Sequence, residues 1–259
     1  MKTFFFYTGA PVNVFGIELE LIRKHEKAGD EVRVFQCTGN LAGCHWNLRH
    51  NPFRCALCRS CFKKGWNALK PSKNVELKRF SQSDALNPPP EKIFLSVDEL
   101  KQFRYDDEKI GYGIASTLIS IFRDHRFDTV AYAKDILNLM SAAIHVYNTF
   151  KREFTENRPD RVFIFNGRIA TCQPVILLCK KLKIEYFVYE LATPANHYRL
   201  LREATVHNAE AALEEIEKTW AGGGPNKEEE ARLWFELKRK GTTKGNMRSF
   251  THRPIHGTL

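Results

Sequence analysis

The segment from residue 37 to residue 61 carries five of the chain's seven cysteines, spaced C-x6-C-x10-C-x2-C-x2-C, together with His45 and His50. Thiolates and imidazoles at such short spacings are typical metal ligands, because a turn brings two neighbours onto one ion. The segment has few apolar residues, and it contains glycines, a proline and several asparagines. A bound metal would therefore supply the stability that a hydrophobic core cannot supply here.

Four of these cysteines form the predicted ligand set. Cys55 and Cys58 have the two-residue spacing of a metal-binding turn, and Cys37 and Cys44 form a second pair across a wider loop. Four thiolates around one ion leave no open coordination position, which is typical of structural zinc. Cys61 is then the spare thiol, although the repeated two-residue spacing keeps an iron–sulfur cluster open as an alternative. Either histidine could replace one sulfur, and free or disulfide-bonded thiols are a third interpretation.

The two remaining cysteines, Cys172 and Cys179, lie seven residues apart in an apolar segment of helical pattern. That spacing places both on one face of a helix, and we interpret them as core residues.

The composition of the whole chain bounds its class and its partners. With 259 residues, a net charge of +10 and a pI near 9.3, the chain can bury a large core and suits a phosphate-bearing partner. Nucleic acid, a nucleotide and an anionic membrane surface all fit that charge, as does simple solubility. No stretch approaches the length of a membrane span, so we predict a cytoplasmic protein, with the inner face of the membrane as a second location. In that compartment clustered cysteines favour metal over disulfides.

Continuous apolar strands alternate with helical patterns, which predicts an α/β fold. The strands predicted are 3–7, 31–36, 74–80, 161–165 and 184–189, and the helices are 14–28, 110–123, 131–156, 169–182, 205–220 and 227–240. Strands without polar alternation suit a parallel sheet covered on both faces. We therefore predict a Rossmann-like parallel sheet flanked by helices, with an inserted cysteine-rich zinc knot and a helical C-terminal extension. The predicted domains are 1–200, containing the insertion 37–61, and 201–259, a helical extension and tail leading toward an absent second domain.

Polar residues follow the predicted strands at their carboxyl ends, where open α/β sheets bind ligands. Asn13 lies in the loop region after the first strand, and Asn166, Gly167 and Arg168 form a tight turn between a strand and a helix. A turn of this kind suits a phosphate or sugar hydroxyls. Glu190 ends another strand and suits a general base or a hydroxyl acceptor. A glycine turn with a solvated arginine, and a plain surface carboxylate, remain equally compatible.

Several common catalytic and nucleotide-binding motifs are absent. The sequence contains no G-x-x-x-x-G-K-[ST], no G-x-G-x-x-G, no H-E-x-x-H and no G-x-S-x-G. It also lacks the Asp-x-Asp pair with which one broad class of sugar transferases holds a metal-bound nucleotide.

Taken together, the sequence resembles bacterial surface-polysaccharide biosynthesis proteins of the capsule and O-antigen type, glycosyltransferases with the two-Rossmann-domain GT-B architecture. The residues that carry the resemblance are 16–22, His25, 29–32, the cysteine block with Asn47 and His50, Gly111, 116–118, 166–168 and Glu190. The resemblance supports Cys37, Cys44, Cys55 and Cys58 as the metal set.

The resemblance implies an acceptor-side domain of a glycosyltransferase, inactive without its donor-binding domain. Its partners would be a sugar, polysaccharide or lipid-linked acceptor, and a nucleotide-sugar donor bound by the missing domain. Asn13, Asn166, Gly167 and Arg168 would bind substrate, and Glu190 would be the catalytic base. Two alternatives remain: a zinc-stabilised nucleic-acid-binding protein, disfavoured by the lack of interleaved aromatic and basic residues, and an iron–sulfur redox protein.

Overall fold

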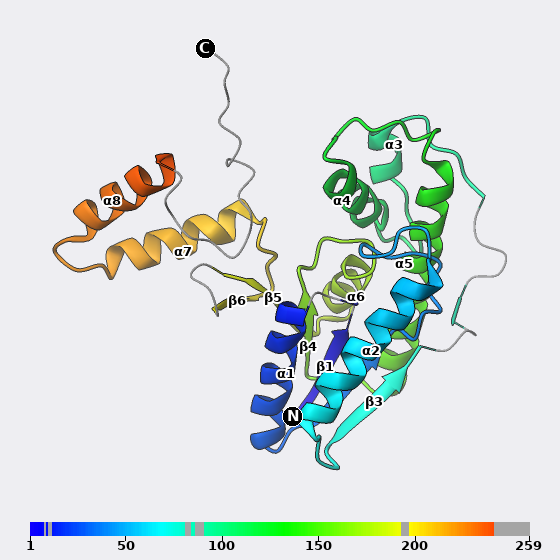
Figure 1. Ribbon diagram of the computed structural model, residues 1–259, viewed down its shortest axis with the longest axis horizontal. Helices are drawn as coiled ribbons and strands as arrows, with labels where there is room; N and C mark the ends of the chain where they lie inside the picture. Colours follow the sequence, from blue (N-terminus) through cyan, green and yellow to red (C-terminus); the bar gives the residue numbers. More distant parts are fainter. Residues whose placement is uncertain (8, 10–11, 81–83, 86–90, 193–196, 241–259) are drawn as a thin grey trace. The chain divides into compact units, whose positions relative to one another are not determined.

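The computed structural model describes residues 1–7, 9, 12–80, 84–85, 91–192 and 197–240 (Figure 1). Its strands are β1 (Lys2–Tyr7), β2 (Glu31–Gln36), β3 (Val75–Arg79), β4 (Arg161–Phe165), β5 (Glu185–Leu191) and β6 (Tyr198–Arg202). Its helices are α1 (Val12–Lys27), α2 (Pro52–Leu69), α3 (Val97–Lys101), α4 (Gly111–Phe122), α5 (Ala133–Glu156), α6 (Gln173–Leu182), α7 (Ala209–Ala221) and α8 (Lys227–Arg239).

The strands form one sheet in the order β3-β2-β1-β4-β5-β6. β1 pairs in parallel with both β2 and β4, and the pairs β2–β3 and β4–β5 are also parallel. The prediction of an α/β protein with a Rossmann-like, mostly parallel sheet flanked by helices is confirmed. The strand order reverses between β1 and β4, so the loops after β1 and β4 diverge there and leave a crevice at the carboxyl edge.

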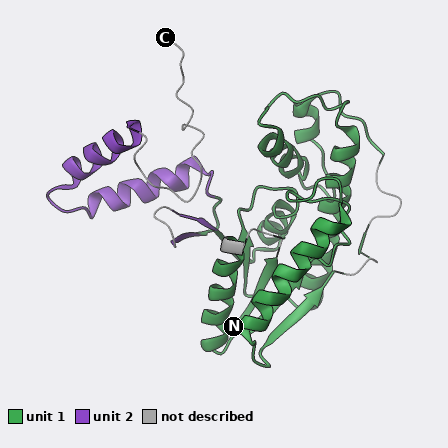
Figure 2. Ribbon diagram, in the orientation of Figure 1, with its two compact units in different colours: residues 1–189, 201–205 green, residues 190–200, 206–259 purple. Residues whose placement is uncertain are grey.

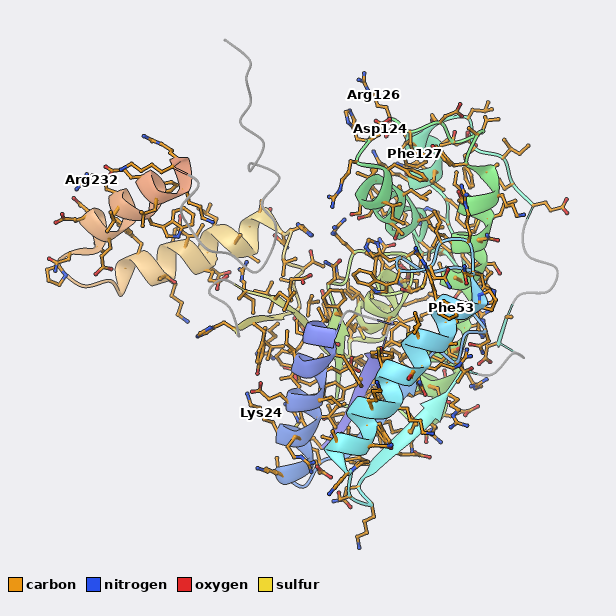
Figure 3. All side chains as sticks on the ribbon, viewed as in Figure 1. Lys24, Phe53, Asp124, Arg126, Phe127 and Arg232 are labelled. Atoms are coloured by element: carbon orange, nitrogen blue, oxygen red, sulfur yellow. The ribbon has the colours of Figure 1, made fainter. Side chains whose placement is uncertain are left out.

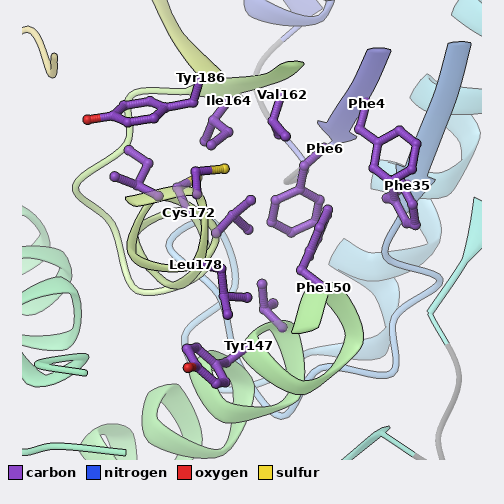
Figure 4. Close-up of a cluster of buried hydrophobic side chains, with 14 of the residues drawn as sticks. Phe4, Phe6, Phe35, Tyr147, Phe150, Val162, Ile164, Cys172, Leu178 and Tyr186 are labelled. Atoms are coloured by element: carbon purple, nitrogen blue, oxygen red, sulfur yellow. The ribbon is translucent and has the colours of Figure 1, made fainter. Parts of the chain in front are cut away.

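The two faces of the sheet are covered by different helices (Figure 1). Phe4 and Phe6 of β1 are fully buried in a cluster with side chains of α5 and α6, part of which Figure 4 shows. The next residue along β1, Tyr7, points to the opposite face, because successive side chains of a strand alternate. Its ring packs on Phe15 of α1 and Phe62 of α2, with centroid distances of 4.6 and 4.9 Å. Tyr7 thus joins β1 to the helix that carries Cys55 and Cys58.

The chain divides into two compact units (Figure 2). One comprises residues 1–189 and 201–205, and the other comprises residues 190–200 and 206–259. In the second unit, α7 and α8 bury none of their described residues, although they carry Trp220, Trp234 and Phe235. Among the described residues, no helix has the length and apolar character needed to cross a membrane. The predicted tail, residues 241–259, lies outside the described residues.

Three predictions of local structure were wrong. The second half of the cysteine segment was taken as a metal-fixed loop, but it is α2, whose first residue is Pro52 and whose N-cap is Asn51. The Asn51 side chain accepts hydrogen bonds from the backbone N–H groups of Phe53 (2.9 Å) and Arg54 (3.4 Å). Asparagine followed by proline is a typical helix start, and here it outweighs the loop character of the preceding residues. In addition, β6 was not predicted, and α6 starts at Gln173 rather than at 169 because Pro174 marks its first turn.

A carboxylic acid is buried between α1 and β5. Glu18 is 1% exposed, and its Oε2 accepts a hydrogen bond from the Tyr189 hydroxyl at 2.9 Å. Its Oε1 has no hydrogen-bond partner among the described residues. Burial raises the pKa of this carboxyl to about 8, and the Tyr189 hydrogen bond offsets only part of that shift. Glu18 is therefore protonated at neutral pH, because ionising it would bury an uncompensated charge.

This burial predicts a pH-dependent stability. The pKa of the Glu18 carboxyl is higher in the folded chain than in the unfolded chain, so the folded chain binds more protons between about pH 4.5 and pH 8. The contribution of Glu18 to the free energy of unfolding is fully present below that window. It is lost as the pH rises through the window, and the total loss is on the order of 5 kcal/mol. The substitution Glu18→Gln removes the ionisation, so the variant should gain stability over the natural chain as pH rises from 5 to 9.

Urea unfolding at pH 5, 7 and 9 measures this difference, with Glu20→Gln on the exposed face of α1 as the matched control. The control should follow the pH profile of the natural chain. Parallel profiles for Glu18→Gln and the natural chain would show that Glu18 does not titrate in this window.

Candidate functional site

A small pocket lies at the carboxyl edge of the sheet, beside the point where the strand order reverses. Its volume is about 60 Å³. β1 and the segment after it contribute Phe6 and Gly9, and the loop between β4 and α6 contributes Thr171. All four predicted metal ligands line it, and the remaining lining residues are Gly39, Leu41, Trp46, Asn47 and Arg54. We call it the thiol pocket.

Three local structures place the four cysteines at the thiol pocket. Cys37 follows β2 directly. Cys44 lies in a turn closed by a pair of backbone hydrogen bonds with Asn47 (3.2 and 3.0 Å). Cys55 and Cys58 lie in the first two turns of α2, three residues apart and therefore on one face of the helix.

Another face of α2 points to solvent. Phe53, labelled in Figure 3, is 70% exposed. Cys61 is also exposed and is not among the residues that line the pocket.

Hydrogen-bond donors are directed at the sulfurs. The backbone N–H of Gly39 lies 3.4 Å from Cys37 Sγ, and the next two backbone N–H groups also contribute. The side-chain amide of Asn47 donates to Cys55 Sγ at 3.2 Å, and the backbone N–H groups of residues 46 and 47 donate to Cys44. A neutral thiol is a weak acceptor, whereas a thiolate is a strong one. Two of the thiols also have an oxygen acceptor: Cys37 Sγ lies 3.9 Å from Asn40 Oδ1, and Cys58 Sγ lies 3.8 Å from the Tyr7 hydroxyl. The contacts therefore serve neutral thiols as well as thiolates.

Asn47 also fixes the loop that approaches α2. Its side-chain amide donates to the Asn51 carbonyl, and its Oδ1 accepts from the Asn51 backbone N–H, both at 2.8 Å. His50, in a left-handed conformation with φ of 50°, places its Nε2 at 2.7 Å from the carbonyl oxygen of Gly39. His45 packs edge-on against the Trp46 ring. Neither histidine lines the thiol pocket, so neither takes the place of a sulfur there.

Burial of these thiols disfavours their ionisation. Burial raises the pKa of Cys37 and Cys58, and it raises that of Cys44 to about 12. Cys58 lies 3.8 Å from the Tyr7 hydroxyl, whose pKa is also raised, first by burial and then by the thiol's charge. Burial lowers the pKa of His45 to about 4, and the charges of Arg168 and Arg123 lower it further.

The predicted closed zinc site was wrong. Among the residues that the structure describes, no group of three or more His, Cys, Asp or Glu side chains is arranged to hold a single metal ion. The four cysteines line one pocket, but that pocket is not a closed four-ligand zinc site. The zinc knot predicted as part of the fold is likewise not seen.

The predicted polar turn is structured by its own contacts. Asn166 and Gly167 have positive φ values of 59° and 77°. The positive φ of Gly167 favours glycine, and an added Cβ there would also press on the end of the Ile176 side chain at 2.6 Å. Arg168 donates to the Ser116 hydroxyl at 2.9 Å and, through its backbone N–H, to Asn166 Oδ1 at 3.4 Å.

The other predicted ligand-binding residues lie elsewhere. Asn13 belongs to the first turn of α1, and its side chain is outside the described part of the chain. Glu190 belongs to the second unit, where its carboxylate accepts a hydrogen bond from the backbone N–H of Leu191 at 3.1 Å.

Only the four cysteines of the pocket were assigned to a site from the sequence, and its other lining residues were not. Asn47 and Trp46 lie inside the cysteine segment, but only the thiols and imidazoles were considered as ligands. Thr171 was placed inside a helix predicted from 169, whereas it precedes α6. Reading Pro174 as a helix start would have placed Thr171 in the loop at the edge of the sheet.

Comparisons with known proteins do not identify a family for this chain. No family model matches the chain, and no curated protein matches it. A solved structure that matches is described as the structure of a CDPS from Fluoribacter dumoffii. It is 13% identical, with a TM-score of 0.43, and the match covers 78% of this chain and 90% of that one. A likeness at this level assigns no function.

The predicted membership of the polysaccharide glycosyltransferase family was wrong. The comparisons return no glycosyltransferase, and the solved structure that they return is described as a CDPS. The roles that followed from that family, for Glu190 as a base and for a nucleotide-sugar donor, lose their basis with it. Neither a nucleic-acid-binding protein nor an iron–sulfur redox protein gains support from these comparisons. The comparisons do not test whether the cysteines bind a cofactor.

The contacts of Asn47 predict its importance for stability. The side chain is 6% exposed, and its three hydrogen bonds join the loop to α2. Asn47→Ala should lower the free energy of unfolding by about 1–3 kcal/mol, because the Asn51 backbone N–H loses its partner. Urea unfolding measures the change, with Asn67→Ala on the exposed face of α2 as the control. Equal effects of the two substitutions would contradict the proposed role of Asn47.

Proposed function

We propose that the thiol pocket binds a polynuclear iron–sulfur cofactor on Cys37, Cys44, Cys55 and Cys58. One observation carries the proposal: four cysteines line one small pocket, yet no three of the described candidate ligands suit a single ion. Thiolates are soft ligands that select zinc, copper(I) or iron–sulfur clusters. Of these, a cluster uses sulfurs that are spread around several bridged metal ions rather than around one.

The surroundings of the pocket favour an anionic occupant. Cys55 and Cys58 lie near the N-terminus of α2, and Thr171 lies just before the N-terminus of α6. Helix N-termini carry partial positive charge and stabilise anions. Neither helix has an acidic residue in its first turn that would compete for this charge. A cluster ligated by four thiolates is an anion, and the donors directed at the sulfurs suit it equally.

Two glycines let the backbone pack closely against the cysteine side chains. An added Cβ at Gly9 would lie 3.1 Å from Cys58 Sγ, and one at Gly39 would lie 3.3 Å from Cys55 Cβ. Both glycines have positive φ values, of 77° and 92°. When bound, the cofactor would cross-link the loop after β2 to α2. Its role in this proposal is to stabilise the fold.

Reconstitution with iron and sulfide under anaerobic conditions tests the proposal. The natural chain should take up more than one iron per chain with matching acid-labile sulfide, and it should show a broad visible absorption. Serine substitution of any one of the four cysteines should abolish most of this uptake, because serine oxygen is a poor ligand for such clusters. Cys61→Ser is the matched control, since Cys61 follows Cys58 on the same helix but does not line the pocket.

Two results would overturn the proposal. One is a natural chain that binds no iron, or only a single zinc or copper ion, under these conditions. The other is a Cys61→Ser variant that loses as much iron as the four other serine variants, which would place the metal away from the thiol pocket.

A further inference from the structure

Apolar side chains of α8 lie uncovered in the second unit. Leu233, Trp234, Phe235 and Leu237 are between 38% and 57% exposed. Leu233 and Trp234 lie four and three residues before Leu237, so these three side chains share one face of the helix. None of the four lines the groove of about 540 Å³ that α7 and α8 line, and neither helix buries a described residue. Apolar residues grouped on an exposed surface typically mark an interaction site.

The charged residues of α8 are divided between its ends. Residues 228–230 are glutamates in the first turn, and residues 238–240 are lysine, arginine and lysine at the end. Arg232, labelled in Figure 3, pairs within the helix with Glu229 at 3.6 Å and with Glu236 at 2.7 Å. No carboxylate that the structure describes pairs with any of the three basic residues at the end. This order of signs suits the helix dipole, but it also leaves complementary charges at the two ends of one exposed apolar stretch.

We propose that α8 pairs in antiparallel orientation with α8 of a second copy of this chain. In that orientation the acidic first turn of each helix lies beside the basic end of the other, and each apolar middle lies beside the same residues of the second copy. A parallel pair would bring like charges together at both ends, so the charge pattern selects the antiparallel pair. A twofold interface needs a patch that is complementary to itself, and α8 has one.

The acidic residues argue against an anionic membrane surface as the occupant of this face. Besides the three glutamates that begin α8, α7 carries four glutamates and one lysine. An anionic surface attracts clusters of basic residues and repels acidic ones. A second α8 helix matches the apolar stretch and both charged ends at once.

Charge reversal at each end of α8 tests the pairing in the full chain. The natural chain at high micromolar concentration should have a mass by light scattering of twice the 30.0 kDa of one chain. The all-basic variant changes residues 228–230 to lysine, and the all-acidic variant changes residues 238–240 to glutamate. Each variant alone should have the mass of a monomer, because its helix ends now repel those of its copy. An equimolar mixture of the two should recover the mass of a dimer, which a change in the stability of α8 alone would not produce.

A second variant removes the apolar contact and keeps the helix. Leu233→Ala combined with Leu237→Ala retains high helix propensity, so its circular dichroism should match that of the natural chain while its mass halves. Leu95→Ala is the matched control, because Leu95 is 81% exposed but belongs to the first unit, and this variant should stay dimeric.

Three results would overturn the proposal. They are a natural chain that is monomeric at high micromolar concentration, charge-reversed variants that are each dimeric alone, and a mixture of those variants that stays monomeric.

Discussion

The need to compensate buried sulfur governs the carboxyl edge of this molecule. Four cysteines line one small pocket, and backbone and amide N–H groups are directed at the sulfurs. Thiolates cannot stay charged in such a setting without positive charge nearby, and neutral thiols use the donors poorly. The metal–sulfur core that we propose would satisfy both requirements at once. Among the described residues, no group of three or more candidate ligands is arranged to hold a single metal ion.

The parallel sheet explains why the sulfurs meet where they do. β1, β2 and β4 end at one edge, so Gly9, Cys37 and Thr171 come together from distant parts of the sequence. α2 then brings Cys55 and Cys58 to the same edge, because Phe62 packs on Tyr7 at the end of β1. The aromatic packing on one face of the sheet thus positions the sulfur chemistry at its end.

Much of this was predictable from sequence, for physical reasons that also mark the limits. Continuous apolar strands predicted β1, β2, β4 and β5, because both faces of a parallel sheet are buried. The cysteine set was identifiable from spacing, but spacing alone does not distinguish ligands that close on one ion from ligands that surround a cluster. α2 was missed because its capping pair, Asn51 and Pro52, also suits a loop. The sequence around Thr171 does not mark it as a pocket residue, since its place beside the pocket depends on where α6 begins.

Iron K-edge X-ray absorption of the anaerobically reconstituted natural chain tests the central claim most directly. Each iron should have a shell of sulfur neighbours and a second shell of iron neighbours, because the proposed cofactor contains bridged metal ions. A sulfur shell without metal neighbours, or iron ligated mainly by oxygen and nitrogen, would contradict a polynuclear cofactor on these four cysteines.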